Sequence, residues 1–197
     1  MVEFYINGQN VDVKIEDEET IGDVLNSFEQ ICEENEVSVI GINIDGRKIT
    51  AETFDEEAKK SLSGNEKFDF TIITKEEIRQ SFLKLSELFT ELASKMEEVP
   101  SDLQNGKNLE VSESIKKLAD SINQFSHTAA LASLYPETFA ETTIDGLTFN
   151  EFFGDFSSIL KDFESALQNN DTIMIGDLSE YEICPRLRSI AEALNKF

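Results

Sequence analysis

The stretch "KFDFTIITKEEIRQSFLKLSELF", residues 67–89, changes its hydrophobic period in the middle. Phe68 and Phe70 alternate with polar residues, which is the pattern of a strand with one buried face. From Ile78 onward the apolar residues recur every three or four positions, and this helical pattern stops before Pro100. The sequence therefore predicts that a strand gives way to a long amphipathic helix close to residue 74.

The chain before this point predicts a small mixed α/β domain over residues 1–74. Two dipeptides, Asn7-Gly8 and Asp45-Gly46, separate short apolar stretches that alternate with period two, and each predicts a hairpin turn. Thr20 and Asp23 form a capping-box pattern, so an amphipathic helix is expected from there to about Asn35. The predicted order is strand, strand, helix, strand, strand, a short helix or loop, and a final strand, with the first hairpin continuing through Val13 and Ile15.

This order and this length resemble the β-grasp, or ubiquitin-like, fold, in which a mixed sheet wraps around one helix. The resemblance covers about residues 1–74 and is a match of pattern. Sulfur carriers and ubiquitin-type modifiers of this fold act through a Gly-Gly terminus, whereas this domain runs into "TKEEIRQSF" and the chain ends in "LNKF". Ferredoxin-type members need four cysteines, and this region has only Cys32. The resemblance therefore implies a docking or scaffolding module.

Residues 75–197 predict an all-α domain that resembles a four-helix bundle. A second helix is expected to end at Tyr135-Pro136, and an irregular connection then leads to a capping-box pattern at Thr148 and Glu151 that starts a third. A fourth helix is expected over residues 172–195. The fold class expected for the whole chain is α+β, with a β-grasp domain followed by this bundle.

Composition restricts the classes of partner. The 197 residues include 40 acidic and 17 basic side chains, for a net charge of −23, and both predicted domains are acidic. This charge disfavours nucleic acid and anionic membrane and favours a basic protein partner. No apolar stretch approaches the roughly 20 residues that span a bilayer, and "MVEFYINGQN" lacks the pattern of a signal peptide, so we expect a cytoplasmic protein.

The sequence contains no recognisable catalytic pattern. Its two cysteines are isolated, so neither a metal site nor any other cofactor site is predicted. Its single histidine, His127, lies on a predicted helix, and this arrangement is similar to histidine phosphotransfer domains. Their motif H-x-x-K-G is not matched, because Ala130 and Leu131 stand at the lysine and glycine positions. We therefore expect a non-catalytic protein-interaction module, an adaptor or an assembly factor. The alternatives are a chaperone for an export substrate, and a phosphocarrier or enzyme that uses His127 or a carboxylate pair.

Three groups of residues are candidates for partner binding. Arg47 and Lys48 form a basic island at a hairpin tip. The aromatic cluster at 149–156 either fills the core or presents an exposed patch through Phe149 and Phe153. Two further rare positive charges are Arg186 and Arg188.

The stretch "GDLSEYEICPRLRSI", residues 176–190, predicts a bend in the last helix. Pro185 removes one helical hydrogen bond and clashes with the carbonyl of Tyr181, so a kink is expected there. The apolar residues before Pro185, Tyr181 included, and those after it point to different sides of an ideal helix. Glu182 falls in an apolar sector, and we expect it to be partly buried and paired with Arg186. Pro185 and Glu182 are therefore predicted to have structural roles.

Overall fold

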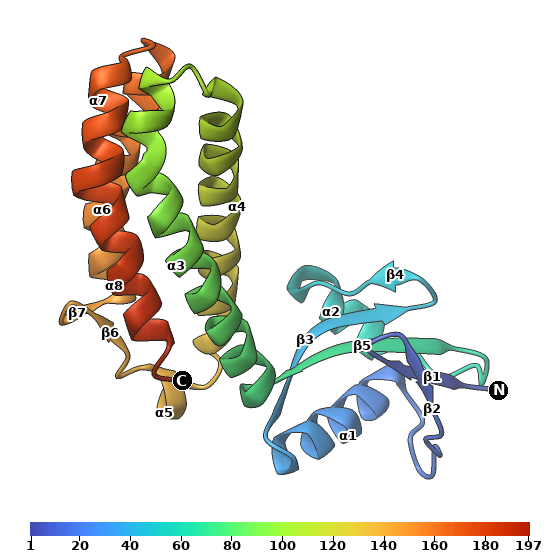
Figure 1. Ribbon diagram of the computed structural model, residues 1–197. Coiled ribbons are helices and arrows are strands. Elements are labelled where there is room, and N and C mark those ends of the chain that lie inside the picture. The colour runs from blue at the N-terminus through green and yellow to red at the C-terminus, as the bar shows by residue number, and fades with distance from the viewer. The chain divides into compact units, whose positions relative to one another are not determined.

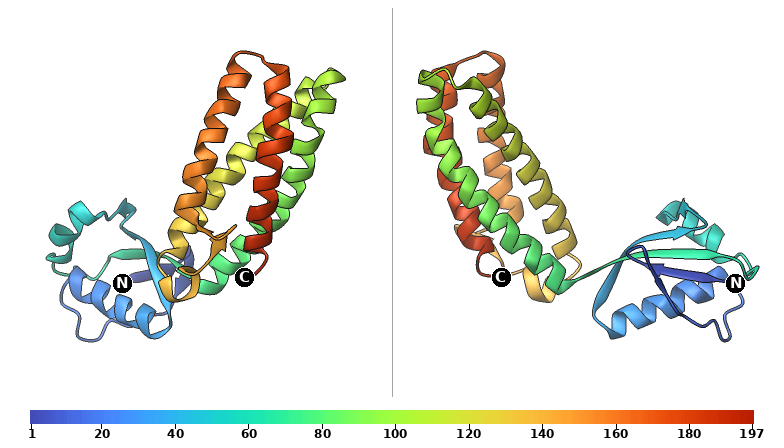
Figure 2. Two further views of the ribbon diagram at one scale, coloured as in Figure 1. Left: turned by 90° about the vertical axis from the view of Figure 1, so that its left-hand side faces the viewer. Right: turned by 45° about the vertical axis from the view of Figure 1, so that its right-hand side comes forward.

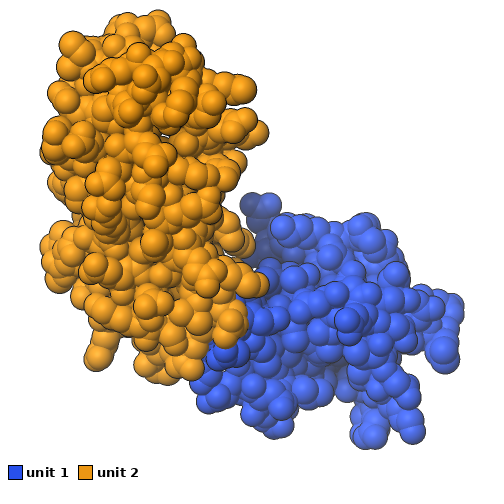
Figure 3. Space-filling model, viewed as in Figure 1, with its two compact units in different colours: residues 1–77 blue, residues 78–197 orange.

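The computed structural model describes all residues from 1 to 197. The chain is α+β and divides into two compact units, unit 1 at Met1–Glu77 and unit 2 at Ile78–Phe197, which Figure 3 colours separately. All five strands of the large sheet lie in unit 1, and unit 2 is mainly helical. No helix is both long enough and apolar enough to cross a membrane.

Unit 1 is a mixed five-stranded sheet with a helix across one face (Figure 1). The strand order is β2-β1-β5-β3-β4, and the β1–β5 pair in the middle is parallel while its neighbours are antiparallel. The elements are β1 (Glu3–Ile6), β2 (Gln9–Val11), α1 (Ile21–Glu34), β3 (Val37–Ile44), β4 (Arg47–Lys48), α2 (Ala51–Ala58) and β5 (Lys67–Thr74). This is the element order that the hydrophobic pattern predicts.

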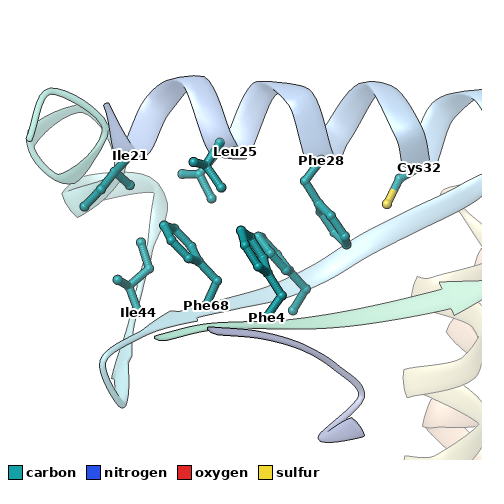
Figure 4. Close-up of a cluster of buried hydrophobic side chains, with 9 residues drawn as sticks. Phe4, Ile21, Leu25, Phe28, Cys32, Ile44 and Phe68 are labelled. Atoms are coloured by element: carbon teal, nitrogen blue, oxygen red, sulfur yellow. The ribbon is translucent and has the colours of Figure 1, made fainter. Parts of the chain in front are cut away.

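The core of unit 1 lies between α1 and the sheet, where aromatic rings interdigitate (Figure 4). Phe28 of α1 stacks on Phe70 of β5 with ring centroids 3.7 Å apart, and Phe4 stacks on Phe68 at 5.3 Å. Aromatic side chains bury the largest apolar areas, so these rings supply much of the driving force for this small unit. Both predicted hairpin turns are present, and their Asn-Gly and Asp-Gly pairs have the positive φ angles that such turns require.

The first hairpin is shorter than predicted. β2 ends at Val11, and Val13 is exposed in the loop that follows. The alternation of Val11, Val13 and Ile15 is real, but only Val11 has a strand partner, Phe4 of β1. An alternating sequence becomes a strand only where a neighbour supplies the backbone hydrogen bonds.

A β-bulge interrupts β3 and changes which residues face the core. Val39 pairs with Ile72 and Gly41 with Thr71, so Ile40 is an extra residue on this strand. Val37 and Val39 pack against the core before the bulge, and Ile42 and Ile44 do so after it. The sequence places Ile40 in phase with Ile42, but the bulge leaves Ile40 partly exposed.

Unit 2 is built from long helices that run alongside one another in every view (Figures 1 and 2). They are α3 (Lys75–Gln104, which starts at the end of unit 1), α4 (Asn108–Ala132), α6 (Phe149–Gln168), and a continuous run of α7 (Thr172–Asp177), the π-helix η1 (Leu178–Ile183) and α8 (Cys184–Leu194). Short elements connect α4 to α6, namely α5 (Pro136–Phe139), β6 (Thr143–Ile144) and β7 (Leu147–Thr148).

The prediction that the first long helix stops before Pro100 is wrong. α3 continues through Pro100 to Gln104, and the turn follows at Gly106, whose φ is positive. Proline inside a helix costs about 3 kcal/mol, but here its ring packs against α7, where a Cβ on Gly176 would lie 3.3 Å from the Cβ of Pro100. The neighbouring Val99 is also buried, so tertiary packing offsets the cost of the proline.

A π-helix, η1, directly precedes the turn that contains Pro185, where the sequence predicts a kink. The Cys184 N–H donates to the Ser179 carbonyl, five residues back, so the wider turn accommodates the missing N–H of Pro185. Successive buried residues four apart, Ile175, Ser179, Ile183 and Leu187, then stay on one side. An ideal α-helix would rotate this line by about 40° every four residues.

The predicted change of buried face within this helix is therefore wrong. Tyr181, expected on the apolar side, is 65% exposed. Because fewer degrees separate successive residues in a π-helix than in an α-helix, the apolar line remains continuous past Pro185.

The connection between α4 and α6 contains more structure than predicted. Thr143–Ile144 pairs with Leu147–Thr148 around an Asp145-Gly146 turn in which both φ angles are positive. Ile144 is fully buried and anchors this small hairpin on the helices. The irregular segment expected from the sequence is in fact a fixed hairpin that leads directly into α6.

Two glycines provide a test of close helix packing. A Cβ on Gly22 of α1 would lie 2.8 Å from the carbonyl oxygen of Ala58, which is backbone and cannot move aside cheaply. We expect Gly22→Ala to lower the free energy of unfolding of unit 1 by about 1–3 kcal/mol. Gly154→Ala in α6 meets no atom within 4 Å and should stabilise unit 2 by about 0.5–1 kcal/mol. Urea unfolding followed by amide resonances of each unit would check both, and a Gly22→Ala variant as stable as wild type would contradict this packing.

Glu66 provides a test of stability against pH. Its buried carboxylate accepts hydrogen bonds from the N–H groups of Ser63 and Gly64 in the turn before β5. Burial raises the pKa of Glu66, but the hydrogen bonds outweigh burial and hold the pKa below its ordinary value. The stabilisation is therefore complete above the ordinary glutamate pKa of about 4.3, and is lost as pH falls through the lower folded-state pKa.

We expect Glu66→Gln to destabilise unit 1 by about 1–2 kcal/mol at pH 7. The difference from wild type should shrink as the pH falls below about 4, because wild-type Glu66 is then protonated as well. Urea unfolding of both proteins between pH 3 and pH 7, followed by amide resonances of β5, measures the difference directly, and the general effect of the many other carboxylates cancels. A difference independent of pH would contradict the role given to the carboxylate.

Candidate interaction groove

An open groove of about 510 Å³ lies in unit 2, where the last turns of α4 meet α5 and the first turns of α6. Its size falls within the range of ligand and peptide sites in proteins. Aromatic, alanine and small hydroxyl side chains make up nearly all of its lining: Phe125, Ser126, Ala129, Ala130, Ala132, Ser133, Pro136, Phe139, Ala140, Thr142, Thr148, Phe149, Asn150 and Phe153.

Three phenylalanine rings form the base of the groove. Phe125 of α4 is buried, and Phe153 of α6 stacks on it with ring centroids 4.6 Å apart. Phe149 meets the same ring edge-on at 5.2 Å. Phe149 and Phe153 are each only partly buried, so their remaining surface faces the groove. The base is thus a rigid aromatic surface that can accept apolar side chains.

The start of α6 fixes where these rings lie. The Thr148 hydroxyl accepts a hydrogen bond from the Glu151 N–H, and the Glu151 carboxylate accepts from the Thr148 N–H at 3.0 Å and its hydroxyl at 2.7 Å. The bond from the Thr148 side chain, followed by that from its backbone, holds the pKa of Glu151 below its ordinary value. This capping box, predicted from the sequence, sets Phe149 as the first residue of the helix and therefore sets the direction of both groove rings.

Small side chains on α4 form one wall. Ser126, Ala129, Ala130 and Ser133 recur at intervals of three and four residues, and so lie on one face of the helix. The hydroxyl of Ser126 donates to the carbonyl of Ile122, and that of Ser133 to the carbonyl of Ala130. Because both hydroxyl protons are used within the helix, this wall offers mainly apolar contact.

The segment that forms the groove carries acidic side chains but neither lysine nor arginine. Residues 118–160 contain no lysine or arginine and six acidic residues: Asp120, Glu137, Glu141, Asp145, Glu151 and Asp155. All the groove-lining residues fall within this segment. The segment that forms the apolar groove thus contributes only negative charge, which favours a positively charged partner.

The reactive side chains of the chain lie elsewhere or are inaccessible. His127 is exposed on α4, and it is not a lining residue of the groove. Cys32 and Cys184 are buried, and burial raises the pKa of both thiols. No group of three or more histidine, cysteine, aspartate or glutamate side chains is placed to hold a metal ion. What the groove itself offers is a shaped apolar surface.

The structure brings together only two of the residues that the sequence singles out for partner binding, Phe149 and Phe153. Arg47 and Lys48 lie on β4 in unit 1, where both are exposed and Arg47 is 3.8 Å from Glu57. Arg188 of α8 forms an ion pair with Glu97 of α3. None of these three residues lines the groove.

Arg186 connects two helices of unit 2. Its guanidinium donates to the Glu182 carboxylate at 2.6 Å, one turn earlier, and to Asp155 of α6 at 3.0 Å. Glu182 is partly buried and forms an ion pair with Arg186, and both observations agree with the prediction. Pro185 lies beside Arg186 at the start of α8. Arg186 is thus already engaged by two carboxylates.

Sequence reasoning missed the alanines of the groove wall and Phe139. Ala129, Ala130 and Ala140 carry no distinctive chemistry, and their importance comes from the space that they leave. One signal for this region was present in the sequence, namely the 43 residues without lysine or arginine.

The two arginines of α8 give a matched test of their ion pairs. Arg186 is 24% exposed and contacts two carboxylates, whereas Arg188 is 52% exposed and contacts one. We expect Arg186→Lys to lower the unfolding free energy of unit 2 by about 0.5–1.5 kcal/mol, because lysine cannot bridge both partners. Arg188→Lys should cost less than about 0.5 kcal/mol. Thermal unfolding at low and high salt would compare them, and equal effects would contradict the bridging role.

Each unit matches a model of a known protein family. Residues 2–74 match a family model described as the TP0873 N-terminal domain, and residues 80–193 match one described as Domain of unknown function (DUF8042). A protein of Treponema pallidum (strain Nichols), described as "Uncharacterized protein", is 22% identical over 189 residues, which cover 96% of this chain and 94% of the relative. No solved structure matches. Since the second model spans more than half of its residues, the chain belongs to the DUF8042 family.

Proposed function

We propose that this protein is a non-catalytic adaptor or assembly factor of the cytoplasm, and that its groove binds the apolar face of a basic amphipathic helix from a partner protein. The single observation that carries the proposal is the groove itself, an aromatic base and an alanine wall within a 43-residue segment that lacks lysine and arginine. Such a surface combines apolar recognition with attraction for positive charge.

The dimensions of the groove favour a helix as the bound element. The wall from Ser126 to Ser133, the C-cap of α4, covers seven residue steps, which is about 10 Å along the helix axis. A partner helix presents apolar residues at positions i, i+3 or i+4, and i+7 over the same distance. Two turns of such a helix would therefore cover the groove from end to end.

Charge supports a basic partner over a second copy of this chain. Each copy carries −23, so two copies repel one another. A lysine- or arginine-rich helix is instead attracted, and its association rate should fall as salt increases. The apolar contacts in the groove would then provide the selectivity that long-range attraction lacks.

We further infer that the units have the architectures which the sequence resembles. The strand order β2-β1-β5-β3-β4 around α1 supports a β-grasp fold for unit 1. The long helical runs α3, α4, α6 and α7–α8 support a four-helix bundle for unit 2. Both architectures serve as scaffolds that hold a binding surface rigid.

A designed peptide tests the proposal. We would measure, by fluorescence anisotropy, the affinity of the full chain for a labelled 18-residue helix with leucine on one face and lysine on the other. The control peptide has the same composition in scrambled order, because any cationic peptide is attracted to a protein of this charge. Preference for the amphipathic peptide by about tenfold or more is expected.

Matched variants locate the binding surface. Ala130→Trp fills the groove from an exposed position of α4, and should weaken binding of the amphipathic peptide by about tenfold or more. Ala119→Trp makes the same change at an exposed position of the same helix outside the groove, and should leave binding unchanged. Equal affinities for the two peptides, or for the two variants, would contradict the proposal.

A further inference from the structure

Unit 1 contains an open strand edge. β3 pairs with β5 along its whole length, but on its other side it pairs with β4 only at Asn43 and Ile44, apart from one bond from the Ile49 N–H to the Ile42 carbonyl. The segment Val37–Gly41 has no strand on that side, and none of its residues is buried. An uncovered edge presents backbone N–H and C=O groups that another extended chain can pair with.

An apolar pocket lies beside this edge. It has a volume of about 320 Å³, and β3, α1 and α2 enclose it. Phe28 and Phe54 belong to its lining, and so do Val39, Ile40 and Ile42 of the strand itself. A chain that paired with the edge would therefore run along the mouth of a pocket able to accept its side chains.

The bulge in β3 contributes to this arrangement. Because Ile40 is the extra residue at the bulge, it takes no regular place in the alternation that sends Val39 and Ile42 to the core. It remains 41% exposed and lines the pocket. Bulges often redirect one side chain at a functional surface, and here the redirected side chain is a large apolar one.

The surroundings of the pocket are acidic. α1 carries Asp23, Glu29, Glu33 and Glu34 and no basic residue, and residues 49–58 carry Glu52, Asp55, Glu56 and Glu57 and none either. Glu29 itself lines the pocket. Glu57 itself is ion-paired with Lys60 at 2.6 Å and with Arg47 of β4 at 3.8 Å, so the other acidic residues carry the negative charge of this surface. An apolar ligand that also carries lysine or arginine is complementary to this surface.

We propose that the Val37–Gly41 edge of unit 1 is a second binding site, which takes an extended, lysine- or arginine-containing segment of a partner protein as an additional β-strand. The backbone of that segment pairs with β3, and its alternate apolar side chains enter the pocket beside Ile40. This mode of recognition gains affinity from main-chain hydrogen bonds and selectivity from side-chain pockets. It differs from the groove of unit 2 in both position and ligand conformation.

Backbone methylation of a model peptide tests the main-chain pairing. The probe is a short peptide that alternates lysine with valine or isoleucine, and two versions of it carry N-methyl groups, one on the lysine amides and one on the apolar amides. In a β-strand only every second residue directs its N–H toward a given neighbour. One methylated version should therefore lose affinity by about tenfold or more, and the other should keep it. Equal affinity of both versions would overturn the proposal.

Substitution of Ile40 tests the position. Ile40→Lys places a positive charge at the pocket rim without disturbing a buried residue, and should weaken binding of the unmethylated peptide by about tenfold or more. Val13→Lys is the matched control, because Val13 is 40% exposed, lies in the same unit and does not line this pocket. Its affinity should equal that of wild type. Equal weakening by both variants, or the absence of amide shifts in Val37–Val39 when peptide is added to the full chain, would overturn the proposal.

Discussion

The contact between Phe125 and Phe153, with ring centroids 4.6 Å apart, is the interaction on which the groove of unit 2 depends. It holds the last turns of α4 against the first turns of α6, and the same Phe125 ring also meets Phe82 and Phe89 of α3. Apolar surface buried by rings of this size is worth several kcal/mol. The Phe125 ring is thus shared between core and groove, and the groove keeps its shape because its base is part of the core.

Local contacts at the start of α6 position the rest of the groove. The capping box at Thr148 and Glu151 fixes the first residue of α6, and the buried Ile144 anchors the hairpin that precedes it. α4 then needs only small residues opposite the rings to leave space. A polar site would need a hydrogen-bond partner for each buried donor and acceptor. This apolar groove needs only an open space between the rings and the small side chains, and no positive charge in its own segment.

Hydrophobic periodicity predicted most of the elements, because the period of two in residues 67–74 and the helical period after Ile78 reflect local backbone geometry. Hydrophobic periodicity did not predict the features of the fold that tertiary contacts determine. Pro100 remains within α3 and packs closely against Gly176, which is distant in sequence. Pairing with β5 decides the bulge at Ile40, and a π-helix keeps the apolar line of the last helix continuous. Of the site, Phe149 and Phe153 could be named from sequence, but Ala130 could not, since only the fold turns an alanine into a groove wall.

Binding of a basic amphipathic helix in the groove is measured most directly by site-specific photo-crosslinking in the native cell, with benzoylphenylalanine in place of Asn150 at the groove. The same group in place of Ala119, on the far part of α4, serves as reference. We expect the Asn150 position to crosslink to a segment with lysine or arginine on one face and apolar residues on the other, and the reference position to give no such crosslink. Crosslinks that are the same at both positions, or that reach acidic or non-amphipathic segments, would contradict this expectation.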